Sequence, residues 1–338
     1  MNYAPVFISG WFCSGTTALW SAYRRLPGHV AYYEPLHANL AAHIEHTRPK
    51  PSHVGVQDYW QAYQQLEQGR ALHCRSFAYQ RLILGSDETW PELRQWLQAL
   101  MAVKAKRHVL KFNRVAFRLP WLKKNWPEAK IVHLRRNVRD AWVSTRRHLP
   151  PEQWDDADHV DAYETAQTAW ALANDLPVLL SPEASASAYH RFFLLWTLAE
   201  QVAAAHADIA IDLEGLKREP FQVLDSLAQL GALDQSDIAL AVSAISDSGH
   251  AGHTEFRSES WFDAIEQAAQ AQMEAMGLFD FPVRSLAQIK ASKADVWREQ
   301  FDQMQTAPGI QRLLLELSLS RDSAIAAHAK DQAAQGSD

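Results

Sequence analysis

The residues from Gly10 to Ala18 combine two glycines, one cysteine and three hydroxyl side chains between segments of different periodicity. The apolar run from Pro5 to Ile8 is typical of a buried strand, and the apolar positions 19, 20 and 23 have the spacing of a helix face. A loop between a strand and a helix can hold an anion, because its N–H groups and those of the first helical turn point to one spot. The sequence therefore predicts an anion site here, with hydroxyl groups as further donors.

Gly10 and Gly15 are separated by four residues, which is the spacing of a phosphate-binding loop. Kinases and nucleoside-triphosphate hydrolases have lysine after the second glycine, where this chain has Thr16. A P-loop kinase-like phosphotransferase, which would need Mg²⁺, is therefore an alternative without its usual contact to the β- and γ-phosphates. An ordinary tight turn between strand and helix is the other alternative, so residues elsewhere in the sequence must distinguish between these interpretations.

A cationic motif follows the most strand-like run of the chain, Lys130 to Leu134. Arg136 comes two residues after this run, and Ser144 lies eight residues further on, about two turns into the next helix. A guanidinium group can bind a phosphate through two parallel hydrogen bonds. We expect Arg136 to bind an anion in this way, and Ser144 must then face the same side.

Two other predicted strands lead to charged residues. One leads to Glu34 and His37, and the other ends on Lys111, with Arg114 three residues later. Carboxyl ends of parallel strands meet at one edge of a sheet, so these side chains are expected beside the glycine loop. The ordinary alternatives are a solvated strand end for Lys111 and an ion pair between Glu34 and the arginine at position 24 or 25.

Alternating strands and helices indicate an α/β fold that positions these residues. We expect a P-loop-like three-layer fold, with a central parallel sheet flanked by helices and a helical C-terminal portion. The 338 residues are predicted to form a single domain, with a core over residues 5–232 and a helical part over residues 233–332. Further predicted elements are a helix after Thr89 as its cap, helices at 58–67, 158–175, 187–205, 221–230 and 313–330, and a strand at 209–213.

The composition narrows the classes of partner. A net charge of −6 argues against general attraction to nucleic acid or to an anionic membrane, so an anion must be held by a local cluster. The two cysteines, Cys13 and Cys74, have neither metal-ligand nor disulfide-framework spacing, which favours a reducing cytoplasm and no metal. Neither a leader nor a run of about twenty apolar residues is apparent, so membrane insertion is not expected.

Three blocks in order resemble the sulfotransferases that use 3′-phosphoadenosine-5′-phosphosulfate (PAPS). Residues 14–17, Ser-Gly-Thr-Thr, are similar to the 5′-phosphosulfate loop, which usually reads Pro-Arg/Lys-Ser-Gly-Thr-Thr, although Cys13 stands at the basic position. Arg136 and Ser144 match the family's 3′-phosphate motif, and residues 110–114 are similar to the Lys-x-x-Arg strand end of carbohydrate sulfotransferases. Residues 209–220 resemble the family's Tyr-Glu-Asp-Leu-x-x-x-Pro stretch, with changes at 212–214.

The resemblance implies transfer of a sulfuryl group from PAPS to a hydroxyl group, with PAP (3′-phosphoadenosine-5′-phosphate) as the other product and without a metal. A basic segment near the C-terminus often closes over the donor in this family, and Arg257 is the cation that this chain offers there. The residues that would then bind the donor are Cys13, Ser14, Gly15, Thr16, Thr17, Ala18, Arg136, Ser144 and Arg257.

The same resemblance implies the catalytic groups. Glu34 lies twenty residues after Ser14, the approximate position of the catalytic glutamate in tyrosylprotein and several bacterial carbohydrate sulfotransferases, and His37 is the alternative base. Lys111 is the first candidate to stabilise the charge of the leaving group, with Arg114 second, because the loop has Cys13 instead of a basic residue.

A carbohydrate or other small-molecule acceptor is implied, with Arg114 and Trp60 as residues that contact it. The non-enzymatic alternative is a degenerate member of the family that binds PAP without turnover.

Overall fold

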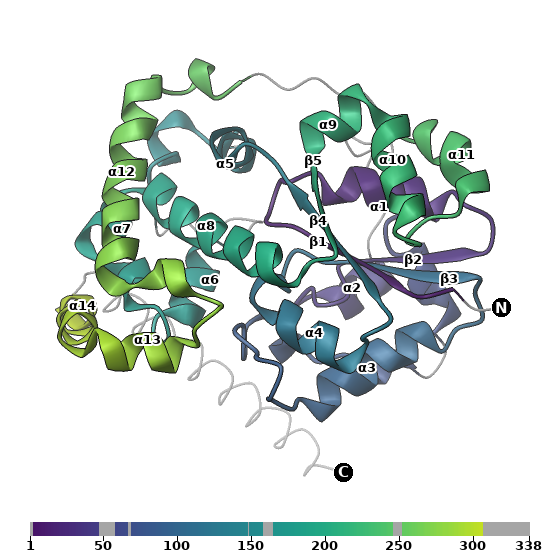
Figure 1. The fold of residues 1–338 in the computed structure, drawn as a ribbon, viewed down its shortest axis with the longest axis horizontal. Helices are drawn as coiled ribbons and strands as arrows, with labels where there is room; N and C mark the ends of the chain where they lie inside the picture. The colour runs from purple at the N-terminus through teal and green to yellow at the C-terminus, as the bar shows by residue number, and fades with distance from the viewer. Residues whose placement is uncertain are drawn as a thin grey trace, which may run out of the picture.

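The computed structural model describes residues 3–46, 58–66, 69–147, 149–157, 165–245 and 252–306. At its centre is one sheet of five parallel strands in the order β2-β3-β1-β4-β5 (Figure 1). This confirms the predicted α/β fold with a central parallel sheet. The strands are β1 (Val6–Ser9), β2 (His29–Tyr33), β3 (Arg107–Lys111), β4 (Lys130–Arg135) and β5 (Ile209–Asp212).

The strand order creates a switch point at the centre of the sheet. From β1 the chain crosses to β2, beyond β3, whereas from β3 it crosses in the other direction to β4. Ligands of open parallel sheets bind at the carboxyl ends of strands where the connections diverge in this way. The register places Tyr33 beside Lys111, and Ser9 beside His133, so these strands end close to one another.

Side chains of successive strand residues enter two different hydrophobic layers. Val6 and Ile8 of β1 pack with one group of helices, while Phe7 packs with the other. The first layer is covered by α1 (Thr16–Arg24), α9 (Leu213–Arg218), α10 (Pro220–Gln229) and α11 (Ile238–Val242). The second is covered by α2 (Leu40–His46), α3 (Pro91–Met101), α4 (Leu119–Asn125), α5 (Val138–Arg146) and α8 (Ala188–His206).

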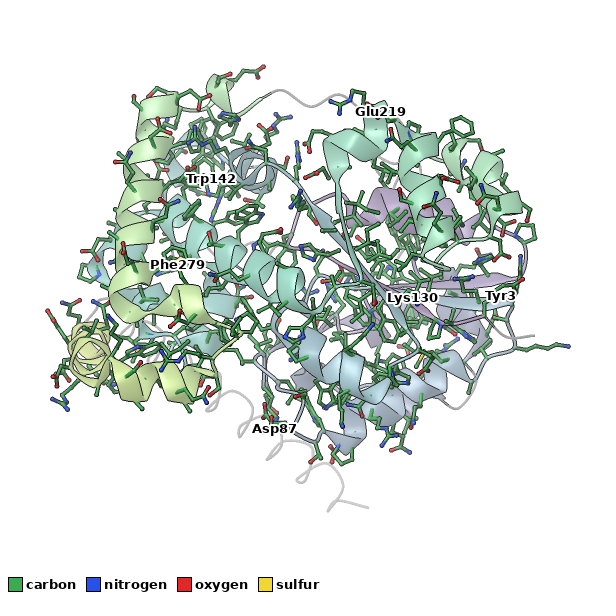
Figure 2. All side chains as sticks on the ribbon, viewed as in Figure 1. Tyr3, Asp87, Lys130, Trp142, Glu219 and Phe279 are labelled. Carbon is green, nitrogen blue, oxygen red and sulfur yellow. The ribbon has the colours of Figure 1, made fainter. Side chains whose placement is uncertain are left out.

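A further group of helices packs beside α8. Trp142 of α5 lies among side chains from α8 and α12 (Figure 2), with ring centroids 5.2 Å from Tyr189 and 5.8 Å from Trp261. Arg139 donates hydrogen bonds to carboxylates of α12, including Glu266 Oε1 at 2.8 Å. This group consists of α6 (Thr165–Leu172), α7 (Pro182–Ala186), α12 (Glu259–Met276), α13 (Leu286–Ser292) and α14 (Ala294–Thr306).

Short 3-10 turns connect these elements. They are η1 (Gln61–Gln65), η2 (Gly69–Leu72), η3 (Arg75–Ala78), η4 (Ala116–Arg118), η5 (Pro151–Gln153), η6 (Pro177–Leu180), η7 (Gln235–Asp237), η8 (His253–Glu255) and η9 (Leu278–Asp280). None of the helices in the described ranges is long and apolar enough to cross a membrane.

Two local predictions were wrong. The helix expected over residues 58–67 is the shorter turn η1, because Trp60, Tyr63 and Leu66 follow the three-residue repeat of a 3-10 helix. The helix α3 starts one residue later than predicted, with Trp90 as its N-cap, so Thr89 does not cap it. The expected helix at 313–330 and the first residues of the one at 158–175 lie outside the described residues. The domain boundaries remain a prediction.

Candidate functional site

The loop between β1 and α1 needs glycine at both ends. A Cβ atom on Gly10 would lie 2.6 Å from the carbonyl oxygen of Leu134 and 2.3 Å from Ser14 Oγ. Gly15 has a φ of +91°, and a Cβ atom there would lie 2.5 Å from Leu213 Cδ1. A larger residue at either position would therefore displace β4, α9 or the loop itself.

Several polar groups of this loop remain available to a ligand. Ser14 Oγ is buried and finds no hydrogen-bond partner among the described residues. The N–H of Ala18 makes the first hydrogen bond of α1, 2.9 Å from the carbonyl oxygen of Gly15. The N–H groups ahead of it belong to the first turn, which a helix leaves without internal partners. The arrangement can hold an anion, with the helix dipole adding to the attraction.

Arg136 and Ser144 come together beside this loop. Arg136 Nη1 donates to Ser144 Oγ at 2.7 Å and to the carbonyl oxygen of Cys13 at 3.4 Å. Ser144 Oγ in turn donates to the carbonyl oxygen of Asp140 at 2.9 Å. Arg136 Nε is buried and has no hydrogen-bond partner within the described part of the chain, where Glu214 Oε1, at 3.8 Å, is beyond hydrogen-bond distance. Arg136 therefore keeps a donor for a ligand.

Glu34 is held by two cations at the carboxyl end of the adjacent strand β3. Lys111 Nζ donates to Glu34 Oε1, and both side chains are buried. Arg114 Nη1 lies 3.4 Å from Glu34 Oε2, and the N–H of Asn113 donates to the same oxygen at 3.2 Å. Burial alone would raise the pKa of Glu34, but the charges of Lys111 and Arg114 outweigh it and hold the pKa below its usual value. The carboxylate is therefore ionised at neutral pH.

The backbone is strained at two of these positions. Among the described residues, the non-glycine residues with positive φ are Cys13 at 64°, Glu34 at 46° and Arg81 at 49°. Such conformations cost about 1–3 kcal/mol each and persist where the surrounding structure imposes them. At Glu34 the N–H donates to the carbonyl oxygen of Lys111 at 2.9 Å, which holds the turn against β3.

The ordinary alternatives for these strand-end residues are wrong. Glu34 binds Lys111, Asn113 and Arg114, so its expected pairing with the arginine at position 24 or 25 is wrong. Arg24 Nη2 instead donates to Asp58 Oδ1 at 2.7 Å. Lys111 is fully buried, so it is not a solvated strand end.

His37 lies close to Glu34 but has a different environment. Burial, together with the positive charge of Arg114, lowers the pKa of His37 to about 4. The ring is therefore neutral at pH 7, and its Nδ1 accepts a hydrogen bond from the N–H of Asn39 at 3.1 Å. The proton of the neutral ring must then be on Nε2, which leaves Glu34 as the better placed proton acceptor.

The structure also places the other two predicted residues. Trp60 lies 5.4 Å from the ring of Tyr33 and stacks on His43 at 4.9 Å, close to the turn that carries Glu34. Arg257 Nη2 donates to Asp155 Oδ2 at 2.8 Å, and its guanidinium lies 5.6 Å from the ring centroid of Trp261. Its charge is thus already paired. Contacts of either residue with a ligand remain predictions.

Asn113 is a site residue whose position sequence reasoning did not identify. Its side-chain oxygen accepts a hydrogen bond from Thr16 Oγ1 at 3.1 Å, while its N–H binds Glu34. Asn113 therefore joins the start of α1 to the carboxylate. The sequence feature that could have identified Asn113 is its position, two residues after the end of β3, because β3 lies next to β1 in the sheet.

A glycine-bounded loop, a helix N-terminus and an arginine from the next strand define a class of α/β proteins that bind phosphate-bearing ligands at the edge of the sheet. A sequence profile described as the sulfotransferase family matches residues 5–178, slightly more than half of the chain. The chain belongs to the sulfotransferase family. This range contains the loop, Glu34, Lys111, Arg136 and Ser144.

Two solved structures are similar to the chain. One is the sulfotransferase domain from the Synechococcus PCC 7002 olefin synthase, with 18% sequence identity, a TM-score of 0.33, and coverage of 80% of this chain and 88% of that one. The other is the sulfotransferase STF1 from Mycobacterium tuberculosis H37Rv, with 16% identity, a TM-score of 0.41, and coverage of 79% and 77%. No curated protein sequence gives a significant match.

Proposed function

We propose that the chain transfers a sulfuryl group from PAPS to a hydroxyl acceptor, directly and in line, with Glu34 as the base. The single observation that carries this proposal is the buried cluster of Glu34, Lys111 and Arg114, linked through Asn113 to the loop and to the start of α1. A proton acceptor and an anion site thereby share one edge of the sheet.

The residues around the loop fit such a donor. Ser14 Oγ and the first turn of α1 would hold its 5′ end, since a buried hydroxyl without a partner is otherwise costly. Arg136 and Ser144 would hold the 3′-phosphate, because the Arg136 Nε–H donates to no group among the described residues and can donate to a phosphate oxygen. The donor supplies the sulfuryl group, and the protein supplies position and charge.

Glu34 would accept the proton of the acceptor hydroxyl as its oxygen attacks. Ionisation at neutral pH keeps the carboxylate in the protonation state that a base needs. Lys111 would hold Glu34 with one of its three N–H bonds and offer another to developing charge. This would compensate for Cys13, which stands where relatives of the resembled type have a basic residue.

The non-catalytic alternative has one observation in its favour. The loop has Cys13 in a left-handed conformation and no basic side chain between Gly10 and Gly15. A protein of that kind would bind PAP and release no sulfated product. The kinase alternative is weaker, because β3 ends on Lys111 and β4 on Arg135, and Asp212 at the end of β5 already binds Arg135 at 2.6 Å.

Transfer of labelled sulfate from PAPS to a panel of alcohols, phenols and glycosides tests the proposal. We expect a sulfated product without added Mg²⁺, and loss of product in Glu34→Gln with PAP binding retained. Phosphate transfer from Mg²⁺-ATP would favour the kinase alternative, and PAP binding without any sulfated product would favour the non-catalytic one. The cytoplasm remains the proposed compartment, in keeping with Cys13 and Cys74, which are not joined in a disulfide.

A further inference from the structure

Tyr33 is the last residue of β2 and directly precedes Glu34. The register aligns Ile8 with Lys111, and Lys111 with Tyr33, across the adjacent strands β1, β3 and β2. Side chains of aligned residues on neighbouring strands point to the same face of a sheet. Ile8 and Tyr33 both pack in the layer that α1 covers, so Lys111 and Tyr33 project from the sheet on the side of α1.

The Tyr33 hydroxyl group faces the first turn of α1. Tyr33 Oη lies 3.5 Å from Thr17 Oγ1, longer than the distance of about 2.7 Å at which two hydroxyl groups usually bond. An oxygen atom of a ligand placed between them could therefore accept a hydrogen bond from both groups. Because Thr17 belongs to the proposed donor site, that oxygen would be one of the donor's own.

The Tyr33 ring also meets the cluster around Glu34. Lys111 Nζ lies 4.3 Å from the ring centroid of Tyr33 and donates a hydrogen bond to Glu34 Oε1. Thr16 is linked to the same carboxylate through Asn113. The two hydroxyl residues that open α1 are thus connected to Glu34 by separate routes, and Tyr33 lies on the second of them.

Neighbouring aromatic side chains fix the position of Tyr33. The ring centroids of Trp20, Tyr59 and Trp60 lie 4.9, 4.6 and 5.4 Å from that of Tyr33. Tyr63 Oη donates to the carbonyl oxygen of Tyr33 at 2.8 Å. A hydrogen-bond donor that is already held in place needs no reorganisation when negative charge develops on a reacting group.

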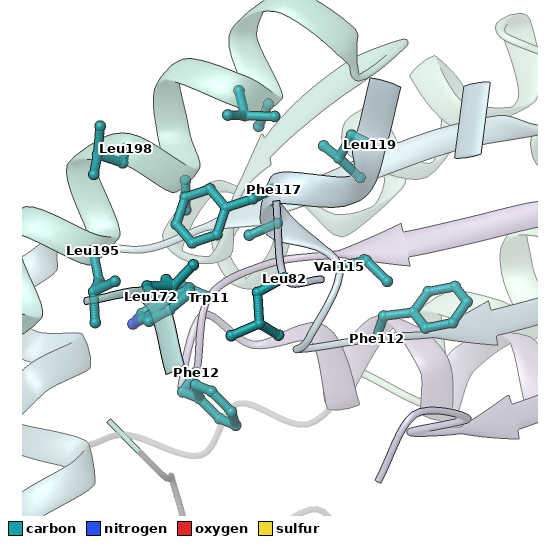
Figure 3. Packing of buried hydrophobic residues seen from close by; sticks show 14 of the residues in the cluster. Trp11, Phe12, Leu82, Phe112, Val115, Phe117, Leu119, Leu172, Leu195 and Leu198 are labelled. Atoms are coloured by element: carbon teal, nitrogen blue, oxygen red, sulfur yellow. The ribbon is translucent and has the colours of Figure 1, made fainter. Parts of the chain in front are cut away.

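The first residues of the glycine loop are packed into the core. Trp11 and Phe12 belong to one buried cluster with Leu82 and Phe117 (Figure 3). The side chains at positions 11 and 12 are only 2% and 5% exposed, whereas Tyr33 is half-buried. A ligand that reaches the loop from solvent therefore meets the side of α1 and Tyr33.

We propose that Tyr33 is a further catalytic residue, whose hydroxyl group donates a hydrogen bond to a sulfuryl oxygen of the donor. This inference rests on the proposed sulfuryl transfer. The acceptor oxygen forms its bond to sulfur as the bond between sulfur and the phosphate oxygen breaks, and the acceptor proton passes to Glu34. Tyr33 keeps its own proton. Together with Lys111 it supplies donors that the loop lacks, because Cys13 stands at the basic position.

Calorimetric titration of the full chain with PAP and with PAPS, without an acceptor, isolates this contact, because the two ligands differ only in the sulfuryl group. Tyr33→Phe removes the hydroxyl group and keeps the ring. We expect the variant to change the affinity for PAP by less than about twofold and to weaken PAPS binding about tenfold, which corresponds to about 1.4 kcal/mol. Equal effects on both ligands, or no effect on either, would overturn the inference.

Turnover measures the same contact in the transition state. Tyr33→Phe should lower kcat at least about tenfold, because charge is spread over the sulfuryl oxygens there. Tyr23→Phe is the matched control, since it removes a buried hydroxyl group of α1 that donates to the carbonyl oxygen of Ala232 at 2.9 Å. The control should lose stability but keep kcat and the affinity for PAPS. The same kcat in both variants would contradict the catalytic role of Tyr33.

A double variant distinguishes direct contact from support of Thr17. If Tyr33 acted only by holding Thr17, then adding Tyr33→Phe to Thr17→Val would cause no further loss of activity. We expect kcat to fall by at least about a further fivefold, because the Tyr33 hydroxyl contacts the sulfuryl group itself. Identical kcat values for Thr17→Val and the double variant would refute that contact.

The result for the unchanged protein separates this inference from the proposed function. If the unchanged protein forms sulfated product and Tyr33→Phe forms it at the same rate, the role of Tyr33 is refuted and sulfuryl transfer stands. If the unchanged protein sulfates no acceptor in the panel, sulfuryl transfer is refuted, and with it the catalytic role of Tyr33.

Discussion

Lys111 donates a hydrogen bond to Glu34 across the boundary between β3 and β2, and their side chains are only 1% and 4% exposed. Each of these charges is buried, and each is compensated by the other. Burial would lower the pKa of Lys111, but the charge of Glu34 outweighs it and raises that pKa. The pair is therefore ionised on both sides. Removing Glu34 leaves Lys111 as an uncompensated buried charge, and removing Lys111 leaves Glu34 with the more distant Arg114 as its cation.

The first prediction concerns stability. Lys111→Met should lower the free energy of unfolding by about 3–5 kcal/mol, because Glu34 then loses its main counter-charge. The double variant Lys111→Met/Glu34→Gln should be more stable than the sum of the single effects predicts. Urea denaturation of all four proteins measures this coupling, and strictly additive effects would show that the two side chains do not stabilise each other.

The second prediction separates catalysis from donor binding. Lys111→Ala should abolish turnover and leave PAP affinity largely unchanged, because Lys111 contacts Glu34 instead of the glycine loop. Glu34→Gln should behave in the same way. Equal losses of turnover and PAP affinity in Lys111→Ala would instead assign this lysine to donor binding.

The third prediction compares two glycines. Gly15→Ala should destabilise the protein by more than about 1 kcal/mol and weaken PAP binding, because φ is +91° and Leu213 occupies the space. Gly215 lies inside α9, and the nearest atom to its added Cβ is 3.9 Å away. Gly215→Ala should therefore stabilise the protein, by up to about 1 kcal/mol. Thermal unfolding measures both, and the same sign for the two variants would contradict the assigned geometry.

The fourth prediction concerns two histidines with opposite shifts. Burial lowers the pKa of His37 to about 4. As the pH falls from about 6.5 towards 4, His37 is therefore protonated in the unfolded chain but not in the folded protein, which lowers the free energy of unfolding. In His253, burial is outweighed by hydrogen bonds to Asp140 and Glu259, which raise the pKa. Protonated His253 therefore stabilises the folded protein below about pH 6.5, and this stabilisation is lost as the pH rises through the folded-state pKa of His253.

Unfolding free energies measured from pH 4 to pH 8 test these signs. The unchanged protein should lose stability relative to His37→Gln as the pH falls, by at most about 1.4 kcal/mol per pH unit. The difference in unfolding free energy between the unchanged protein and His253→Gln should decrease as the pH rises. Parallel pH profiles for all three proteins would refute both assignments.

The sequence predicted those parts of the site that depend on local geometry. The strands β1 and β4 are buried on both faces, so their apolar runs were visible, and helix geometry alone brings Ser144 to the side of Arg136. The partner of Glu34 could not be predicted in this way. It depends on β2 pairing with β3, which places Lys111 within reach and leaves Arg24 with Asp58.

The packing around the glycine loop was not predictable for a related reason. Trp11, Leu82 and Phe117 are ordinary apolar residues in the sequence, and they enter one buried cluster because β1 and β3 are adjacent. The cap at Thr89 was a local prediction that failed, since α3 begins one residue later with Trp90 packed in the core. Local propensity does not decide a helix boundary where tertiary packing fixes it.

Calorimetric titration with PAP tests the central claim, that the loop and Arg136 form the donor site, most directly. We predict micromolar binding that Arg136→Ala and Ser144→Ala each weaken by about 1–3 kcal/mol, the cost of a charge-assisted hydrogen bond. Arg135→Ala is the matched control, because this neighbouring arginine is 48% exposed and binds Asp212, so its loss should leave the affinity unchanged. No binding of PAP, or equal losses in all three variants, would contradict the account.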